Sequence, residues 1–86
     1  MKMKIYRKNV NKTAESIVNK ICNNGDVIIV EISKAAYDWL YMNAGSLANL
    51  VEKLLSDRLG GEYYVVINRE KDYDYSMHVE WYKVNN

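Results

Sequence analysis

Apolar and alternating stretches predict four strands along the chain. Residues 2–8 place Met3 and Ile5 on one face and lysines on the other, which is typical of a half-exposed edge strand. Residues 26–32, DVIIVEI, are a continuous β-branched run, typical of a central strand covered on both faces. Residues 62–69 and 75–84 have apolar or alternating patterns, and the acidic segment 70–74 between them predicts a hairpin.

A helix is predicted over residues 10–24, where apolar residues recur at i, i+4, i+7, i+8, i+11 and i+12. Asn9 or Asn11 can cap its start, and Gly25 can end it. The same apolar face includes Cys22, which we therefore expect to be a small core residue.

Two further helices are predicted in the middle of the chain. Residues 33–44 form a short apolar-periodic segment that Ser33 can cap and Gly45 can close. Ser46 then caps a second helix over residues 46–59, whose apolar stripe ends at Gly60 and Gly61.

These elements predict an α+β fold in the order β-α-β-α-α-β-β. The economical architecture is a four-stranded mixed sheet with its helices packed on one face. Residues 1–86 are too few for two hydrophobic cores, so we expect a single small domain. Because so short a chain buries a modest area, a homodimer is a plausible state.

Composition narrows the location of the protein. Hydrophobic residues make up 49% and charged residues 27% of the chain, as in globular domains. The single cysteine excludes an internal disulfide, which a secreted domain of this size usually has, and therefore predicts a cytoplasmic protein. No apolar run reaches the roughly 18–20 residues of a membrane span, so we expect no membrane partner.

Charge is unevenly distributed. Residues 1–24 carry six basic residues and one acidic residue, a net charge of +5. Residues 25–86 carry six basic and ten acidic residues, a net charge of −4. This asymmetry either guides a charged partner or reflects chance clustering on a solvated surface.

The residue types of known catalytic and metal sites are scarce. One cysteine and one histidine on different elements cannot provide the three or four ligands of a zinc site, and no glycine-rich phosphate loop is present. Ser76, His78 and Glu80 have the residue types of a hydrolase triad. Their strand positions are about 6.6–6.8 Å apart with parallel side chains, which disfavours a hydrogen-bonded relay. We therefore expect neither an enzyme nor a cofactor.

Aromatic and acidic residues are interleaved in the last 24 residues. Tyrosine is enriched at protein interfaces, and acidic neighbours favour a basic protein surface over nucleic acid. The alternative is that these tyrosines serve sheet packing and solubility. The residues predicted to contact a protein partner are Tyr63, Glu70, Asp72, Tyr73, Asp74, Tyr75 and Tyr82.

Residues 26–59 resemble the ribbon-helix-helix family through the strand DVIIVEI, the helix SKAAYDWLYMN, the turn AGS and the helix SLANLVEKLLSDRL. The resemblance implies a dimeric DNA-binding transcriptional regulator whose paired strands enter the major groove. It also implies that amides at the start of the second helix hold a phosphate. Under this alternative, the nucleic-acid contacts are Lys2, Lys4, Arg7, Lys8, Lys12, Ser46 and Leu47.

The leading hypothesis is nevertheless a non-enzymatic protein-binding module. The strand over residues 26–32 has Val, Ile, Asp and Glu where base reading needs polar donors and acceptors free of negative charge. The residue usage, rich in Asn, Lys and Tyr, fits AT-rich codons and hence a low-GC microbe or one of its viruses. We therefore expect a viral or mobile-element inhibitor of a host nucleic-acid machine, in the manner of an anti-CRISPR protein, acting through the Tyr-rich acidic hairpin.

Overall fold

The computed structural model describes residues 2–4, 9–24, 28–31, 34–70 and 76–84, with side chains described for 9–23, 34–68 and 77–84. The elements are β1 (Lys2–Lys4), α1 (Val10–Asn24), β2 (Ile28–Glu31), α2 (Lys34–Leu59), β3 (Tyr63–Glu70) and β4 (Ser76–Lys83). The predicted α+β class is confirmed.

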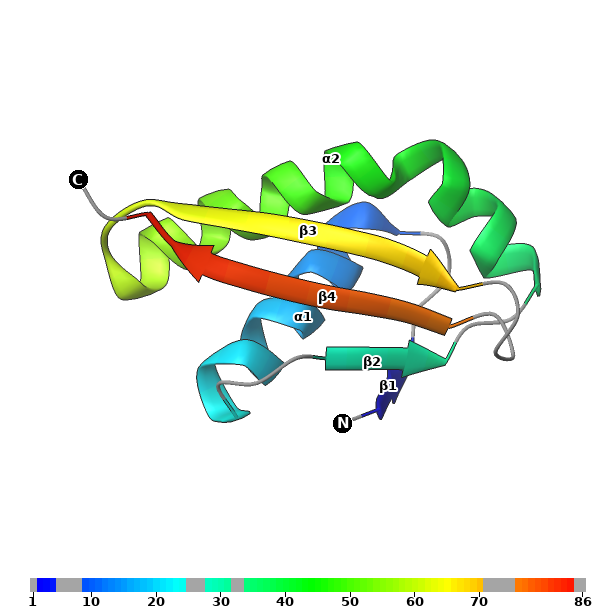
Figure 1. The fold of residues 1–86 in the computed structure, drawn as a ribbon, viewed down its shortest axis with the longest axis horizontal. Coiled ribbons are helices and arrows are strands. Elements are labelled where there is room, and N and C mark those ends of the chain that lie inside the picture. Colours follow the sequence, from blue (N-terminus) through cyan, green and yellow to red (C-terminus); the bar gives the residue numbers. More distant parts are fainter. Residues whose placement is uncertain (1, 5–8, 25–27, 32–33, 71–75, 85–86) are drawn as a thin grey trace.

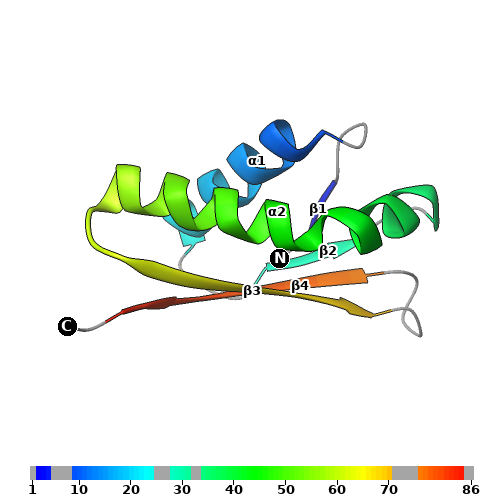
Figure 2. The same ribbon diagram turned by 90° about the horizontal axis from the view of Figure 1, so that it is seen from above.

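The strands lie in the order β1-β2-β4-β3. β1 runs parallel to β2, whereas β4 is antiparallel to both β2 and β3. The predicted hairpin is the β3–β4 pair, whose register runs from Tyr63 opposite Lys83 to Glu70 opposite Ser76. Both helices cover one side of the strands, and the other side is left without a covering element among the described residues (Figures 1 and 2).

Helix α1 begins at the predicted asparagine cap. The Asn9 side-chain oxygen accepts a hydrogen bond of 3.0 Å from the Lys12 N–H, and the Asn9 carbonyl accepts one of 3.0 Å from the Thr13 N–H. The prediction that Cys22 lies in the core is wrong, because Cys22 is exposed. It lies roughly 80° around the helix from buried Ala14, and the buried face is rotated the other way, toward Thr13.

Helix α2 is one helix of 26 residues, so the predicted break at Gly45 and Ser46 is wrong. Leu40, Leu47 and Val51 are all fully buried and lie on one face of a continuous helix. A continuous helix keeps these apolar side chains on one face, and burying each of them stabilises the fold by roughly 1.5–3 kcal/mol. A glycine inside a helix costs about 1 kcal/mol relative to alanine, which is less.

The predicted end of this helix at Gly60 and Gly61 is confirmed. Both glycines have positive φ angles, 74° and 90°. The Gly60 N–H donates a 3.0 Å hydrogen bond to the Ser56 carbonyl and closes the last turn. The chain then reverses and enters β3.

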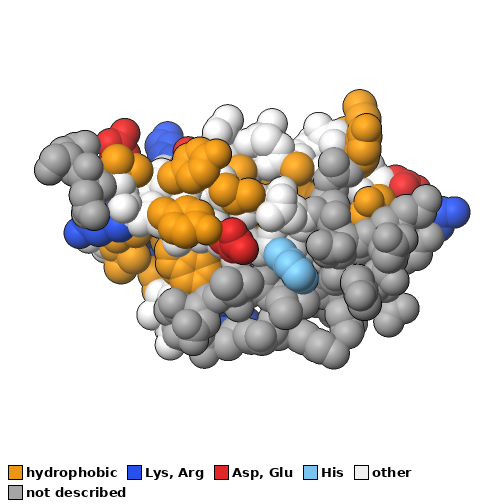
Figure 3. All heavy atoms as spheres, viewed as in Figure 1, with side chains coloured by type: hydrophobic (Ala, Val, Ile, Leu, Met, Phe, Trp, Pro, Cys, Tyr) orange, Lys and Arg blue, Asp and Glu red, His pale blue; other side chains and the backbone are white. Residues whose placement is uncertain are grey.

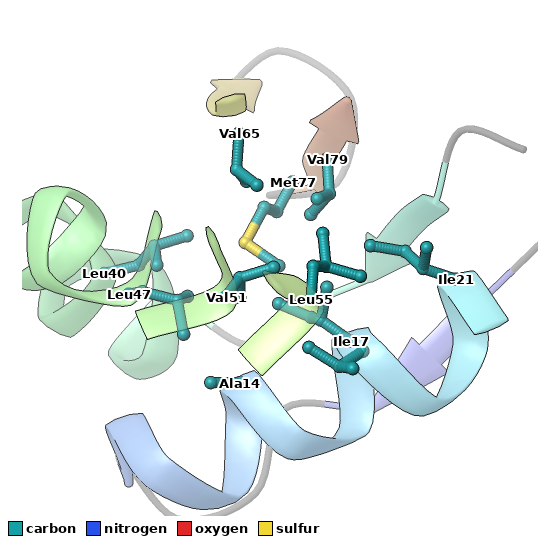
Figure 4. Packing of buried hydrophobic residues seen from close by; sticks show 11 residues of the cluster. Ala14, Ile17, Ile21, Leu40, Leu47, Val51, Leu55, Val65, Met77 and Val79 are labelled. Atoms are coloured by element: carbon teal, nitrogen blue, oxygen red, sulfur yellow. The ribbon is translucent and has the colours of Figure 1, made fainter. Parts of the chain in front are cut away.

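The hydrophobic core lies between the two helices and the β3–β4 pair. The strand residues Val65, Met77 and Val79 point toward the helices (Figure 4). The Met77 side chain reaches between the apolar residues of α1 and those of α2. The fully or almost fully buried members are Ala14, Ile17, Val18, Ile21, Leu40, Leu47, Val51, Leu55, Val65, Met77 and Val79.

Candidate protein-binding face

The β3–β4 pair has one face in the core and one face away from the helices. Val65, Met77 and Val79 are buried, so the residues that alternate with them lie on the opposite face. The ladder extends one rung beyond the strands, because the Val84 N–H donates a 2.8 Å hydrogen bond to the Glu62 carbonyl. We call this opposite face the tyrosine face; it consists of Glu62, Tyr64, Val66, Asn68, His78, Glu80, Tyr82 and Val84.

Cross-strand pairing brings the two tyrosines of this face together. The register places Tyr64 directly opposite Tyr82 and Val66 opposite Glu80. The bond between Val84 and Glu62 marks that rung as hydrogen-bonded, and the Tyr64–Tyr82 rung, two residues along, has the same type with Cα atoms about 5.5 Å apart. The two rings therefore form one neighbouring pair at the middle of the face.

The tyrosine face is accessible. Tyr64 is 58% exposed, Tyr82 54% and Val84 38%. Figure 3 shows hydrophobic side chains gathered over the β3–β4 pair around an acidic side chain, with the histidine next to them. These exposed apolar side chains make the face a candidate contact surface.

Glu80 and Tyr82 are joined on this face. The Tyr82 hydroxyl donates a 2.9 Å hydrogen bond to the Glu80 carboxylate. This hydrogen bond, together with the negative charge of Glu80, raises the pKa of the Tyr82 phenol above its usual value of 10.0. The phenol is thereby kept as a donor that holds the carboxylate beside the aromatic pair.

The charges of the tyrosine face are all acidic at neutral pH. Glu62 and Glu80 contribute two carboxylates, and none of the eight positions is Lys or Arg. The prediction of an acidic setting for exposed tyrosines thus has a definite location on the described part of the hairpin. Strand alternation was the signal that could have separated this face from the buried one.

The predicted contact residues fall in three different settings. Tyr82 lies on the tyrosine face, whereas Tyr63 is partly buried and packs against the core on the helix side. Glu70 is the last residue of β3, opposite Ser76. The other predicted contacts lie outside the described residues; they are Asp72, Tyr73, Asp74 and Tyr75.

Seven residues of the tyrosine face are absent from the predicted contacts; they are Glu62, Tyr64, Val66, Asn68, His78, Glu80 and Val84. They escaped notice because acidic and aromatic residues are dense throughout this segment, and density does not distinguish the two faces of a strand. Strand alternation, counted from the buried Val65, Met77 and Val79, supplies that distinction.

The described residues were also compared with the requirements of a metal site, a catalytic triad and a membrane span. No three His, Cys, Asp or Glu side chains among them come close enough together to hold a metal ion. His78 and Glu80 occupy alternate positions of β4 on the same face, as expected. Neither described helix has both the length and the apolar character needed to cross a bilayer.

The predicted nucleic-acid contacts that the structure describes lie on three different elements, β1, α1 and α2. Lys2 and Lys4 belong to β1, opposite Ile29 and Glu31 of β2, while Lys12 is exposed on the first turn of α1. Arg7 and Lys8 lie outside the described residues.

The ribbon-helix-helix arrangement implied by residues 26–59 is contradicted. Ser46 and Leu47 lie in the interior of α2, where amides are bonded within the helix, and Leu47 is fully buried. β2 pairs with β1 on one side and with β4 on the other, so it has no free edge for a second protomer's strand.

Comparison of the chain with protein-family models, with curated proteins and with solved structures found no match.

Proposed function

We propose that this protein is a non-enzymatic binding module that contacts another protein through its tyrosine face. The observation that carries the proposal is the cross-strand pair Tyr64–Tyr82, in which both rings are more than half exposed and the Tyr82 hydroxyl donates to the Glu80 carboxylate. Tyrosine offers a large contact area and a hydrogen bond at a small entropic cost, and for that reason it is frequent at the centres of protein interfaces.

The rigidity of the platform supports this function. Six of the eight face residues belong to two paired strands, and Glu62 and Val84 extend the ladder by one hydrogen-bonded rung. The other side of these strands is anchored in the core by Val65, Met77 and Val79. Side chains on a packed sheet lose less freedom on binding than those on a loop, which lowers the entropic cost of association. A preorganised face therefore favours a stable protein contact.

The partner we propose is a host protein with a basic surface. Surfaces of this kind are what nucleic-acid-binding proteins present to phosphates. By occupying such a surface, the protein would act as an inhibitor of a nucleic-acid machine, as an anti-CRISPR protein does. This biological setting extends the binding proposal and rests on the acidic character of the face.

The test begins with photo-crosslinking in cells of the native source. A benzophenone amino acid replaces Val66 at the middle of the face, and in the control chain it replaces Asn49, which is exposed on α2. The protein crosslinked only from position 66 is identified, purified and titrated calorimetrically with the wild-type chain.

Point variants then connect that affinity to the face. We expect Tyr64→Ala and Tyr82→Ala each to weaken binding by about thirtyfold, the size of an interface hot spot. Tyr41→Ala is the matched control, because Tyr41 is 65% exposed on α2, away from the face. Equal affinities for wild type, Tyr64→Ala and Tyr82→Ala would contradict the proposal.

A further inference from the structure

We infer that the tyrosine face recognises a pair of arginine side chains four residues apart in an extended segment of the partner. This inference rests on the proposed function and specifies its ligand chemistry. Its basis is the placement of two carboxylates on either side of one aromatic rung.

The carboxylates flank the Tyr64–Tyr82 rung diagonally. Glu62 lies just before β3, two positions ahead of Tyr64, and Glu80 precedes Tyr82 by two positions on β4. Because the strands are antiparallel, these two offsets put Glu62 and Glu80 on opposite sides of the rung. The aromatic pair thus has a negative charge at each end.

Arginine fits this arrangement better than lysine does. A guanidinium is planar, stacks on an aromatic ring and pairs with a carboxylate through two hydrogen bonds. At each end of the rung, one guanidinium can lie against a tyrosine ring and reach the adjacent carboxylate. The hydrogen bond from Tyr82 holds the Glu80 carboxylate in place before the ligand arrives.

The spacing of the carboxylates sets the spacing of the ligand. The Glu62 and Glu80 rungs are four residues apart along the ladder, which corresponds to roughly 13 Å along the strands. In an extended peptide, residues i and i+4 are separated by about the same distance and point to the same side. Residues i and i+3 point to opposite sides.

The experiment is an NMR titration of the full chain, labelled with ¹⁵N, at low salt. The probe is the peptide Ser-Arg-Thr-Ser-Thr-Arg-Ser, in which the arginines are four residues apart. A second peptide has citrulline in place of both arginines, and a third has arginines three residues apart. The protein variants are Glu62→Gln with Glu80→Gln, and, as a charge-matched control, Asp38→Asn with Asp57→Asn on the exposed surface of α2.

We expect the arginine peptide to shift the amide signals of Tyr64, Glu80 and Tyr82 and to bind at least about fivefold more tightly than the other two peptides. The double glutamine variant should lose that preference, while the double asparagine variant keeps it. Shifts confined to other surfaces, or equal affinity for the citrulline peptide, overturn the inference.

Failure of this inference can be told apart from failure of the proposed function. If Tyr64→Ala abolishes binding of the crosslinked partner while the arginine peptide shows no preference, only the ligand chemistry is wrong. If the arginine peptide binds the face while the crosslinked partner tolerates Tyr64→Ala, only the proposed function is wrong.

Discussion

The Glu52 carboxylate accepts a 3.0 Å hydrogen bond from the backbone N–H of Val65, so a side chain of α2 satisfies an amide of β3. β3 is the last strand in the order β1-β2-β4-β3, and the Val65 amide points away from β4. Unpaired amides along such an edge are templates for another strand. Glu52 therefore protects the exposed edge of the sheet next to the tyrosine face.

Replacing Glu52 tests this protection. Glu52→Ala should lower the free energy of unfolding by about 0.5–1.5 kcal/mol, because a partly buried hydrogen bond is lost, and should produce concentration-dependent association through the opened edge. Glu52→Gln keeps an acceptor oxygen and should retain the wild-type oligomeric state. Urea denaturation measures the first effect and light scattering the second.

The control for Glu52→Ala is Lys53→Ala, which alters the exposed neighbour of Glu52 on α2. Edge protection by Glu52 would be wrong if both alanine variants had the same stability and the same scattering mass at every concentration. If Glu52→Ala lowered the free energy of unfolding without causing association, the hydrogen bond would contribute to stability but would not protect the edge.

Gly45→Ala should stabilise the protein. Gly45 lies in the interior of α2 without a positive φ angle, and the space around its missing Cβ is open. Alanine should therefore add about 0.5–1 kcal/mol, visible as a rise of roughly 2–8 °C in the thermal midpoint. If Gly45 instead closed a helix with a positive φ, as the predicted break implies, the same change would destabilise.

Gly60→Ala is the opposite case on the same helix. Gly60 has a φ of 74°, so a Cβ is strained there even though nothing lies within 4 Å. We expect a loss of about 1 kcal/mol. If Gly45→Ala lowered the melting temperature as Gly60→Ala does, the continuous helix would be in doubt.

Capping and turn residues in the sequence correctly predicted where two helices begin or end. The Asn9 cap and the Gly60–Gly61 stop each follow from a few neighbouring residues. The break at Gly45 was predicted from the same kind of signal and was wrong. There the decisive factor was distant: the burial of Leu40 and Leu47 against other elements keeps the helix continuous.

The sequence predicted the segment that carries the candidate site but not the individual residues of its exposed face. Sequence density located the tyrosines in the hairpin, but it selected Tyr63, which packs against the core, and passed over Tyr64. Adjacent tyrosines are chemically alike, and strand alternation from the buried Val65 is what places Tyr64 on the outward side and Tyr63 on the helix side. The Glu52–Val65 bond has no sequence signature, because it joins a helix side chain to a backbone amide 13 residues away.

Thr13→Val should stabilise the helix layer. Thr13 is fully buried in α1, and its hydroxyl has no hydrogen-bond partner among the described residues. Valine has nearly the same shape and no polar group to desolvate, so the free energy of unfolding should rise by about 1 kcal/mol. Thr13→Ser keeps the hydroxyl and removes a methyl group, and it should cost about 1 kcal/mol. A stability loss in the valine variant would show that the hydroxyl is satisfied.

The ionisation of Tyr82 should depend on Glu80. In the folded chain the hydrogen bond and the charge of Glu80 raise the pKa of Tyr82 above 10.0, so Tyr82 should lose its proton at a higher pH than an unperturbed tyrosine. The raised pKa means that folding favours the protonated phenol. Its contribution to stability is complete below the unfolded pKa near 10 and is lost as the pH rises through the folded value.

Ultraviolet difference titration of the wild-type chain against Tyr82→Phe isolates the tyrosinate signal of this residue from the other seven tyrosines. Glu80→Gln should move that signal to lower pH, because an amide still accepts the hydrogen bond but carries no charge to oppose ionisation. The exposed Glu62 is the matched control, since no hydrogen bond joins it to Tyr82 among the described residues, and Glu62→Gln should leave the midpoint nearly unchanged. Identical midpoints in the wild type and Glu80→Gln would mean that the hydrogen bond between Tyr82 and Glu80 does not form in solution. The tyrosine face would then lack this preorganised contact.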